Sequence, residues 1–381
     1  MSVDFRVESE REERANLAPY AILSSRSRGR VYKEPEHPLR TAFQRDHDRV
    51  IYSSAFRRLE YKTQVFPNHE GDHYRTRMTH TIEVSALSRT LARILKLNMD
   101  FSETLGLVHD IGHPPFGHCG ETILANLMNP FGGFEHNKQS HRLITLLENV
   151  YPNFPGLNLS AEVNESILQH SDTPQEGDTD TSPPYLETRL VSLADEIVYN
   201  AHDLEDGLSS GILEESQLRD LEFWSLITAA SDYPASACSE IRRRFVVRSM
   251  MNHMVNDFIN TSFEALRADP PSDFMEARTR SFSLLRFSIK VDGWKMQLEN
   301  FLRKHMYRHP KVTAMMNKSA LFMERIFEHY RKFPEELPLL FQQRILTEGL
   351  ERTIADYIAG MTDRYLQEHY IRLFMPFQKM L

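Results

Sequence analysis

Apolar residues recur at helical spacing through most of the chain, and alternation of apolar and polar residues, which is typical of β-strands, extends over no useful length. From Phe43 to about Asp206 the helical segments are separated by short loops that contain Pro and Gly. Beyond Leu213 the helical spacing continues to the C-terminus. The pattern predicts an all-α fold without internal repeats.

Changes in composition along the chain predict three regions. Residues 1–40 are rich in charge and turn formers, which indicates an extended or partly mobile N-terminal arm. Residues 41–210 form a helical core, and residues 211–381 form a C-terminal helical region. Residues 171–184 are polar and lack periodicity, so we expect a surface loop there.

The overall composition excludes several classes of protein. The 381 residues include 45 Lys+Arg and 53 Asp+Glu, and the net charge of -8 argues against binding nucleic acid through bulk electrostatics. Two cysteines, Cys119 and Cys238, make neither a disulfide framework nor a structural zinc site. The first twenty residues contain no apolar signal region, and no apolar stretch reaches the length of a membrane span. We therefore expect a soluble cytoplasmic protein that does not bind membranes.

Histidines on helix faces are the first candidates for chemistry. The helix predicted from Met78 to about Leu95 carries an apolar stripe, which consists of Val84, Leu87, Leu91 and Ile94. His80 continues the stripe by one turn, so its side chain should point inward. A single inward histidine is more often a hydrogen-bonded core residue than a metal ligand. The next predicted helix, however, ends in the pair His109-Asp110, which adds a second inward histidine beside a carboxylate.

His118 and Glu121 lie three residues apart after a Pro-Pro-Phe-Gly turn. If Gly117 opens a helix, the two side chains are neighbours on one face, and the carboxylate can hold the imidazole in one tautomer. The alternative is an ordinary helix start, where a glutamate favours the positive end of the helix dipole. Spacing alone slightly favours this alternative.

A later segment, LETRLVSLADEIVYNAHDLEDG, predicts a helix with two different sides. Its apolar side consists of Leu190, Leu193, Ile197, Ala201 and Leu204, and its polar side consists of Asp195, Tyr199, His202, Asp203 and Asp206. Most charged helix faces are solvated, so the polar side becomes a candidate site only if other helices cover it.

Together, His80, His109, Asp110 and Asp195 would supply two imidazoles and two carboxylates. This donor set suits Mn²⁺, Fe²⁺ or Zn²⁺, and Mg²⁺ less obviously. A divalent ion activates water near neutral pH and polarises a phosphoryl oxygen, so hydrolysis of a phosphate ester or anhydride is the expected chemistry.

The order His80, His109-Asp110, Asp195 resembles the HD superfamily of metal-dependent phosphohydrolases. More specific are the blocks RDHDRVIYSSAFRRLEYKTQVF, GDHYRTRMTHTIEV, HDIGHPPFGHCGE, GGFEHNKQS and DEIVYNAHDLEDG, which in this order resemble bacterial deoxynucleoside triphosphate (dNTP) triphosphohydrolases of the dGTPase-like group. The resemblance runs from about Leu17 to Asp206 and continues weakly beyond. It implies an HD-domain helical core and a C-terminal region that completes the site and makes oligomer contacts.

The resemblance implies hydrolysis of dNTPs, dGTP among them, at the α-phosphorus to a deoxynucleoside and inorganic triphosphate, with Mg²⁺ or Mn²⁺. It assigns the metal ligands to His80, His109, Asp110 and Asp195. It assigns catalysis to His118, as the acid near the 5′-oxygen, to its partner Glu121 and to His113, which with Arg77 contacts the phosphates. It assigns sugar recognition to Gln64, Tyr199 and Asp203. Tyr307 matches loosely at the phosphate end, and His136 either lines the pocket or ties its loop to the core.

Two alternatives remain open at the level of sequence. One is another HD phosphohydrolase, acting on a cyclic dinucleotide, an alarmone or a nucleoside monophosphate. The other is a sensor that binds dNTPs or single-stranded DNA with little turnover. The resemblance also implies a homo-oligomer, a tetramer or hexamer. The run Arg242–Arg244 is either an effector site for a dNTP or single-stranded nucleic acid, or a solvated helix face, and three adjacent arginines favour the latter.

Overall fold

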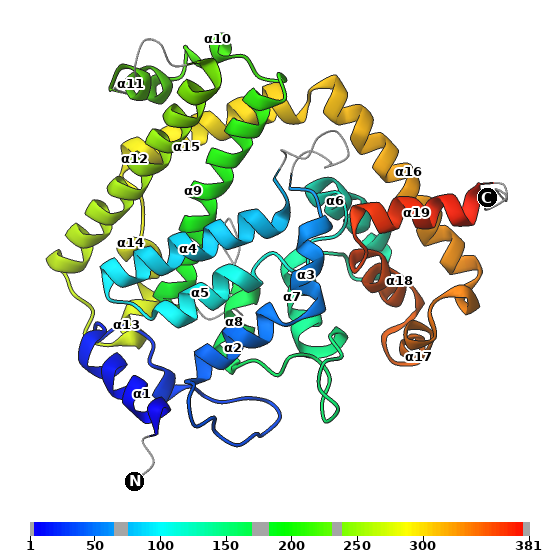
Figure 1. Cartoon of the computed structure of the whole chain (residues 1–381), viewed down its shortest axis with the longest axis horizontal. Helices are drawn as coiled ribbons and strands as arrows, with labels where there is room; N and C mark the ends of the chain where they lie inside the picture. Colours follow the sequence, from blue (N-terminus) through cyan, green and yellow to red (C-terminus); the bar gives the residue numbers. More distant parts are fainter. Residues whose placement is uncertain (1–3, 65–74, 170–182, 231–237, 376–381) are drawn as a thin grey trace. The chain divides into compact units, whose positions relative to one another are not determined.

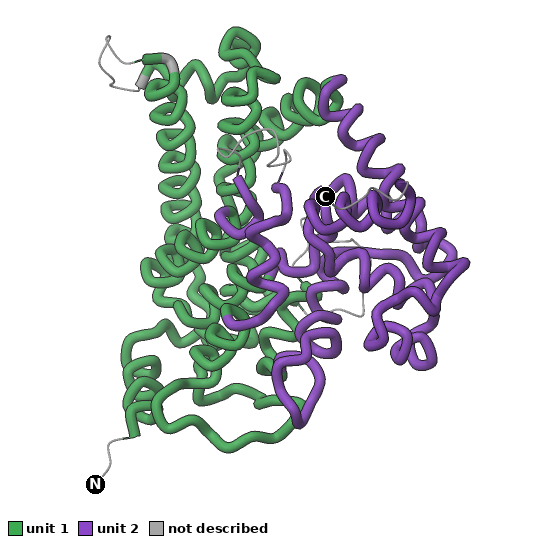
Figure 2. The backbone as a smooth tube through the Cα atoms, turned by 45° about the vertical axis from the view of Figure 1, so that its right-hand side comes forward, with its two compact units in different colours: residues 1–51, 80–108, 158–309 green, residues 52–79, 109–157, 310–381 purple. Residues whose placement is uncertain are grey.

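The computed structural model describes residues 4–64, 75–169, 183–230 and 238–375. These residues form α-helices, short 3₁₀ and π-helical turns and no β-sheet, which confirms the all-α prediction. Two compact units divide the chain, and each is drawn from three separate stretches (Figure 2). Unit 1 comprises residues 1–51, 80–108 and 158–309, and unit 2 comprises residues 52–79, 109–157 and 310–381. The three regions predicted from composition stay a prediction.

The helices of unit 1 come from its three stretches (Figure 1). They are α1 (Phe5–Asn16), α2 (Ala42–Ile51), α4 (Arg77–Leu95, whose first turn belongs to unit 2), α5 (Met99–Val108), α8 (Ala161–Gln169), α9 (Leu186–Ser209), α10 (Glu215–Leu218), α11 (Glu222–Ala230), α12 (Ser239–Ala268), α13 (Phe274–Thr279), α14 (Ser281–Leu284) and α15 (Ile289–Leu302). A π-helical turn at Arg303–Tyr307 follows α15.

Helix α9 lies at the centre of unit 1, where it packs against α5, α12, α14 and α15. Its apolar side is buried as predicted, and His202, Asp203 and Asp206 on its polar side are buried as well. The polar side is therefore covered and meets the condition for a candidate site. Val84 and Leu91 of α4 are also buried, but Ile94, predicted on the same stripe, is 38% exposed, and the last turn of the helix buries Leu95 instead.

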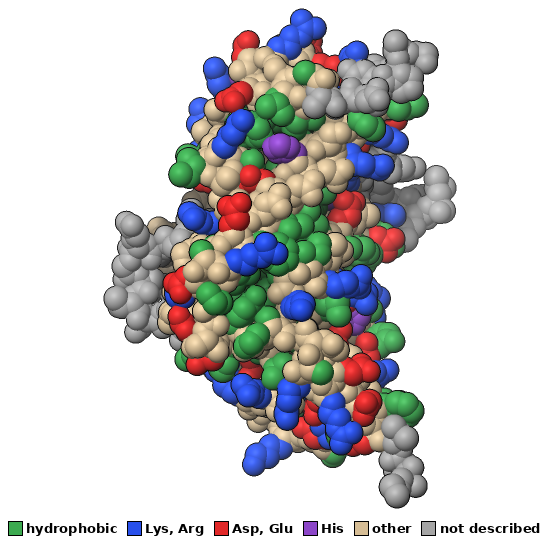
Figure 3. Space-filling model, turned by 90° about the vertical axis from the view of Figure 1, so that its left-hand side faces the viewer, with side chains coloured by type: hydrophobic (Ala, Val, Ile, Leu, Met, Phe, Trp, Pro, Cys, Tyr) green, Lys and Arg blue, Asp and Glu red, His purple; other side chains and the backbone are tan. Residues whose placement is uncertain are grey.

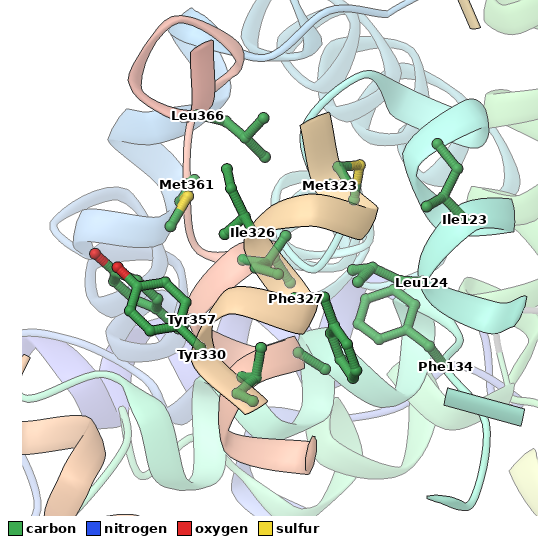
Figure 4. Close-up of a cluster of buried hydrophobic side chains, with 14 of the residues drawn as sticks. Ile123, Leu124, Phe134, Met323, Ile326, Phe327, Tyr330, Tyr357, Met361 and Leu366 are labelled. Carbon is green, nitrogen blue, oxygen red and sulfur yellow. The ribbon is translucent and has the colours of Figure 1, made fainter. Parts of the chain in front are cut away.

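Unit 2 contains α3 (Ser54–Arg58), α6 (Gly117–Met128), α7 (His136–Arg142), α16 (Pro310–Lys332), α17 (Leu339–Glu348), α18 (Leu350–Ala359) and α19 (Asp363–Phe374). Its core joins α6 to the C-terminal helices, and Figure 4 draws Leu124 of α6 in the same cluster as Ile326 of α16 and Leu366 of α19. Each of these three side chains is fully buried, which stabilises the unit by about 1.5–3 kcal/mol per side chain. The C-terminal helices thus share a hydrophobic core with α6.

The N-terminal segment contains a helix, α1, where the composition predicted an extended or partly mobile arm. The carboxylate of Asp4 caps α1 by accepting a hydrogen bond from the backbone N–H of Val7, and Arg6 pairs with Glu10 one turn later at 2.8 Å. Helix α1 has no fully buried residue, so hydrophobic periodicity could not indicate it. The predicted loop 171–184 falls almost entirely outside the described residues.

The run Arg242–Arg244 on α12 is exposed at Arg244 and partly buried at Arg242 and Arg243, and its role stays a prediction. Its three side chains contact different parts of unit 1: Arg242 pairs with Glu215, Arg243 donates to the carbonyl of Leu208, and Arg244 pairs with Glu240.

Figure 3 shows a face of the molecule on which hydrophobic side chains gather between charged ones. Among the described residues, no helix combines the length and hydropathy that crossing a bilayer requires.

Glu187 provides a test of packing in unit 1. Its buried Oε1 accepts hydrogen bonds from the backbone N–H groups of Ile22 and Asn98, both at 3.1 Å. Burial raises the pKa of Glu187 from 4.5 to about 7, so the folded protein holds a proton that the unfolded chain releases between these values. Stability therefore falls as pH rises from about 4.5 to about 7, by roughly 3 kcal/mol. Glu187→Gln keeps the accepting oxygen without the charge and should raise the melting temperature at pH 8 and flatten the pH dependence.

The control is Glu12→Gln, since Glu12 is exposed on α1. Thermal unfolding followed by circular dichroism at pH 5 and pH 8 measures both variants. A Glu187→Gln protein that melts at or below the wild-type temperature at pH 8 would show that the buried charge is not destabilising.

Candidate metal and phosphate site

A buried ion pair lies at the start of the HDIGHPPFGHCGE turn in unit 2. Nη1 of Arg77 is 2.6 Å from Oδ2 of Asp110, and Nδ1 of His113 is 2.7 Å from Oδ1 of the same carboxylate. Burial opposes the charge of Asp110, but Arg77, His113 and His109 outweigh it and hold the pKa of Asp110 well below its usual value. Burial, reinforced by the charge of Arg77, lowers the pKa of His113 well below 6.5, so this ring is neutral at pH 7.

Glu121 forms a second charged centre, held by three histidines. Its Oε1 is 2.8 Å from Nδ1 of His136 and also accepts the backbone N–H of His136 at 2.8 Å. Nδ1 of His118 is 3.7 Å from Oε2, and Nε2 of His113 is 3.9 Å from the same oxygen. His113 and His136 stack at 3.9 Å between ring centroids. One ligand atom from each of His113, His118 and Glu121 lies within 4.8 Å of the other two.

The charges at this centre are coupled. Burial works against ionisation of Glu121, but His118 and His136 outweigh it and lower the pKa of Glu121 far below 4.5. Burial likewise opposes the protonation of His136, and Glu121 reverses this and raises the pKa of His136. His118 is the exposed member, with 57% of its side chain accessible. His136 therefore ties its loop to Glu121, and His118 is the most exposed of these four side chains.

Close backbone packing requires glycine in this turn. A Cβ on Gly112 would lie 2.3 Å from the carbonyl oxygen of His136 and from the backbone nitrogen of Ser140. A Cβ on Gly120 would lie 1.9 Å from the carbonyl oxygen of Pro115. The predicted helix start is confirmed, since α6 begins at Gly117.

Arg77 has unused hydrogen-bonding capacity. Its side chain is only 1% exposed, yet among the described residues neither Nε nor Nη2 has a hydrogen-bond partner. Oε1 of Gln64, also buried, has no partner among them either. A buried donor without an acceptor is costly, and a guanidinium presents a planar fork that matches phosphate or carboxylate oxygens. The two free nitrogens of Arg77 thus fit an anionic ligand.

Two buried residues that the sequence did not single out support the turn from within unit 2. Nζ of Lys62 donates to the carbonyl oxygens of His113 at 2.6 Å and of Ala359 at 2.9 Å. Burial lowers the pKa of Lys62 from 10.5 to about 7. Asp363 accepts the backbone N–H groups of Thr63 and Phe116, each at 2.9 Å. Lys62 stands in one of the blocks noted for resemblance, but contacts this distant along the chain leave no mark in local spacing.

Unit 1 carries the other predicted site residues on α4, α9 and the turn after α15. Nε2 of His80 is 2.9 Å from Oδ1 of Asp195. The hydroxyl of Tyr307 hydrogen-bonds to both Tyr199 and Asp203, so the loosely matched tyrosine joins two of the residues predicted to read the sugar. Burial, and then the charge of Asp203, raises the pKa of Tyr307 well above 10, which keeps it a neutral donor.

The predicted site residues are distributed over both units. Unit 1 contains His80, Asp195, Tyr199, Asp203 and Tyr307, and unit 2 contains Gln64, Arg77, His109, Asp110, His113, His118, Glu121 and His136. The chain passes between the units at Thr79–His80 and again at Val108–His109. The predicted metal ligands His80, His109, Asp110 and Asp195 fit a divalent ion, because they combine buried imidazoles with carboxylates.

Two family models match the chain: the HD domain over residues 77–200 and the phosphohydrolase-associated domain over residues 285–372. Fold and site therefore define an HD phosphohydrolase, a class that implies a divalent metal ion.

Full-length relatives narrow the class. The chain is 44% identical to a protein of Geobacter sulfurreducens over 96% of this chain and 97% of the relative. It is 41% identical to one of Leptospira interrogans over 94% and 96%, and 42% identical to one of Ralstonia pickettii over 94% of both chains. All three are described as deoxyguanosinetriphosphate triphosphohydrolase-like proteins. The chain belongs to this family of dGTPase-like HD-domain proteins.

The support of the turn by Asp363 can be tested directly. Asp363→Asn keeps one accepting oxygen but places an NH₂ group against a backbone N–H, so one hydrogen bond is replaced by a donor–donor contact. We expect the free energy of unfolding to fall by about 1–3 kcal/mol, measured by urea denaturation. Arg364→Ala is the control, because the neighbouring Arg364 is largely exposed and pairs only with Glu368 among the described residues. Equal stability of the two variants would contradict a supporting role for Asp363.

Proposed function

We propose that the protein hydrolyses dNTPs at the α-phosphorus, releasing a deoxynucleoside and inorganic triphosphate. The observation that carries the proposal is the buried Arg77, which uses one nitrogen on Asp110 and leaves Nε and Nη2 without a partner among the described residues. An oligophosphate would complete these contacts. The relatives described as deoxyguanosinetriphosphate triphosphohydrolase-like proteins support the choice of a nucleoside triphosphate.

In this proposal His80, His109, Asp110 and Asp195 hold Mg²⁺ or Mn²⁺, and Fe²⁺ and Zn²⁺ also fit the donor set. When bound, the ion supplies positive charge that polarises a phosphoryl oxygen. Nε and Nη2 of Arg77 bind the phosphates and offset part of their negative charge. The neutral His113 forms a hydrogen bond beside them.

His118 is the proposed general acid. It is the exposed histidine of its cluster, and its Nδ1 is 3.7 Å from Oε2 of Glu121. Protonation of the departing 5′-oxygen by such a group contributes about 10²- to 10⁴-fold to the rate. Glu121 orients His118, and His136 holds Glu121 in place through its ring and its backbone N–H.

Tyr199 and Asp203 are proposed to bind the 3′-hydroxyl of the sugar together with Gln64. Tyr307 fixes the first two by hydrogen-bonding to both. None of these groups is assigned to the base edge, so the proposal names dNTPs as a class. A homo-oligomer remains part of the proposal through the resemblance, and the exposed apolar side chains of Ile241, Phe245 and Ile289 in unit 1 are compatible with it.

The product of the reaction tests the function. The purified protein is incubated with each dNTP and with an equimolar mixture, in Mg²⁺ or Mn²⁺, and the products are resolved by ion-exchange chromatography. The proposal expects triphosphate and deoxynucleoside in equal amounts. Pyrophosphate or orthophosphate as the first product would indicate another HD phosphohydrolase, and binding of dNTPs without turnover, even in the mixture, would indicate a sensor.

Two variants make the assay specific for the site. His118→Ala should bind Mn²⁺ and dNTP like the wild type but lose about 10²-fold or more in kcat, because only the proton donor is removed. His253→Ala is the matched control, since His253 is exposed on α12 in unit 1. Unchanged turnover in His118→Ala would remove the general-acid role.

A further inference from the structure

Two polar residues of unit 1, Glu83 and His202, have no role in the proposed reaction. His202 is buried on α9, two turns after Asp195, and Glu83 lies on α4 one turn after His80. An imidazole buried in a helical core must find partners for its ring nitrogens. The partners of His202 come from α4.

A continuous row of four side chains lies within unit 1, in the order Glu83, His202, His80 and Asp195. Oε2 of Glu83 is 2.7 Å from Nε2 of His202, and Nδ1 of His202 is 3.4 Å from Nδ1 of His80. Nε2 of His80 is 2.9 Å from Oδ1 of Asp195. Members of the row come alternately from α4 and α9, so each helix fixes the side chains of the other.

Hydrogen-bond directions along the row follow from its acidic end. An ionised glutamate can only accept, so Nε2 of His202 carries a hydrogen and donates it to Glu83. When the His202 ring is neutral, its Nδ1 accepts, and the matching donor is Nδ1–H of His80 at 3.4 Å. His80 is thereby held in the tautomer whose Nε2 carries a lone pair.

This tautomer places two electron-pair donors, Nε2 of His80 and Oδ1 of Asp195, 2.9 Å apart. Two such atoms repel one another unless a proton or a cation is shared between them, and an imidazole nitrogen beside a carboxylate oxygen is a normal pair of ligands for a divalent ion. Residues that hold the opposite nitrogen of a metal-binding histidine fix its tautomer and ring orientation.

We propose that Glu83 and His202 are positioning residues that orient His80 and present its Nε2 to the divalent ion. This inference rests on the proposed metal site and adds to it a second imidazole and a carboxylate that do not touch the ion. Glu83 acts at the solvent end of the row, where 47% of its side chain is exposed, so it can be replaced without opening the core.

Mn²⁺ binding to the full-length protein, freed of metal with a chelator, tests the proposal without reference to turnover. Free Mn²⁺ is followed by electron paramagnetic resonance during titration. His202→Phe fills a similar volume and removes both nitrogens, and it should weaken Mn²⁺ binding roughly 10- to 100-fold. Wild-type affinity in His202→Phe would overturn the proposal.

Two substitutions of Glu83 separate hydrogen bonding from charge. Glu83→Gln and Glu83→Ala both remove the negative charge, but only the amide keeps an acceptor for Nε2–H of His202. We expect a loss of about tenfold for alanine and less than about threefold for glutamine. Equal losses would assign the effect to charge alone and contradict the positioning role, as would the absence of any loss. Because Glu83 is half exposed, this comparison still decides the matter if His202→Phe fails to fold.

Arg89→Ala is the control on the same helix, since Arg89 is similarly exposed and pairs with Glu103 at 3.4 Å. It should bind Mn²⁺ with wild-type affinity. A wild-type protein that binds no Mn²⁺ would contradict the metal site itself and with it this inference, whereas a wild type that binds while all variants bind equally would contradict the positioning role alone.

Discussion

The ion pair between Arg77 and Asp110 is the interaction on which the site in unit 2 depends. A single buried charge costs several kcal/mol, and the pair is stable only because each partner has further contacts. Asp110 also meets His113, and the backbone N–H of Arg77 donates to the carbonyl of Lys62. Lys62 in turn binds the carbonyls of His113 and Ala359. The charges of the site are therefore anchored, through Lys62, in the C-terminal helices of the same unit.

The same constraint shapes unit 1 in a different way. Helix α9 is buried on both sides, so its polar side chains are paired within the unit: Asp195 with His80, His202 with Glu83, and Asp203 with Tyr307. A helix of this kind stabilises the unit with its apolar side and holds a constellation of acids, imidazoles and hydroxyls on the other. Asp195, Tyr199 and Asp203, three of the predicted site residues, thus lie on a helix where neighbouring side chains restrict the rotamers.

Local periodicity predicted the parts of the fold that local forces determine. The starts of α4 and α6 and the two-sided pattern of α9 followed from spacing, and so did the neighbourhood of His118 and Glu121. Local periodicity did not predict α1, because a cap and surface ion pairs stabilise this helix and it has no fully buried residue. The hydrogen bond from Lys62 to the carbonyl of Ala359 spans 297 residues, and the hydrogen bond between His136 and Glu121 depends on a loop. Local periodicity therefore could not predict either contact. The predicted site residues belong to two units, each made of three separate stretches of sequence, and this division is likewise a property of the folded chain.

We propose that His80, His109, Asp110 and Asp195 together bind one divalent metal ion. Anomalous X-ray scattering from crystals of the protein grown with Mn²⁺ measures this directly. The account predicts one manganese peak with ligands from His80, His109, Asp110 and Asp195. A manganese ion bound instead by His113, His118 and Glu121, whose ligand atoms also lie within 4.8 Å of one another, or no manganese at the four predicted ligands, would contradict it.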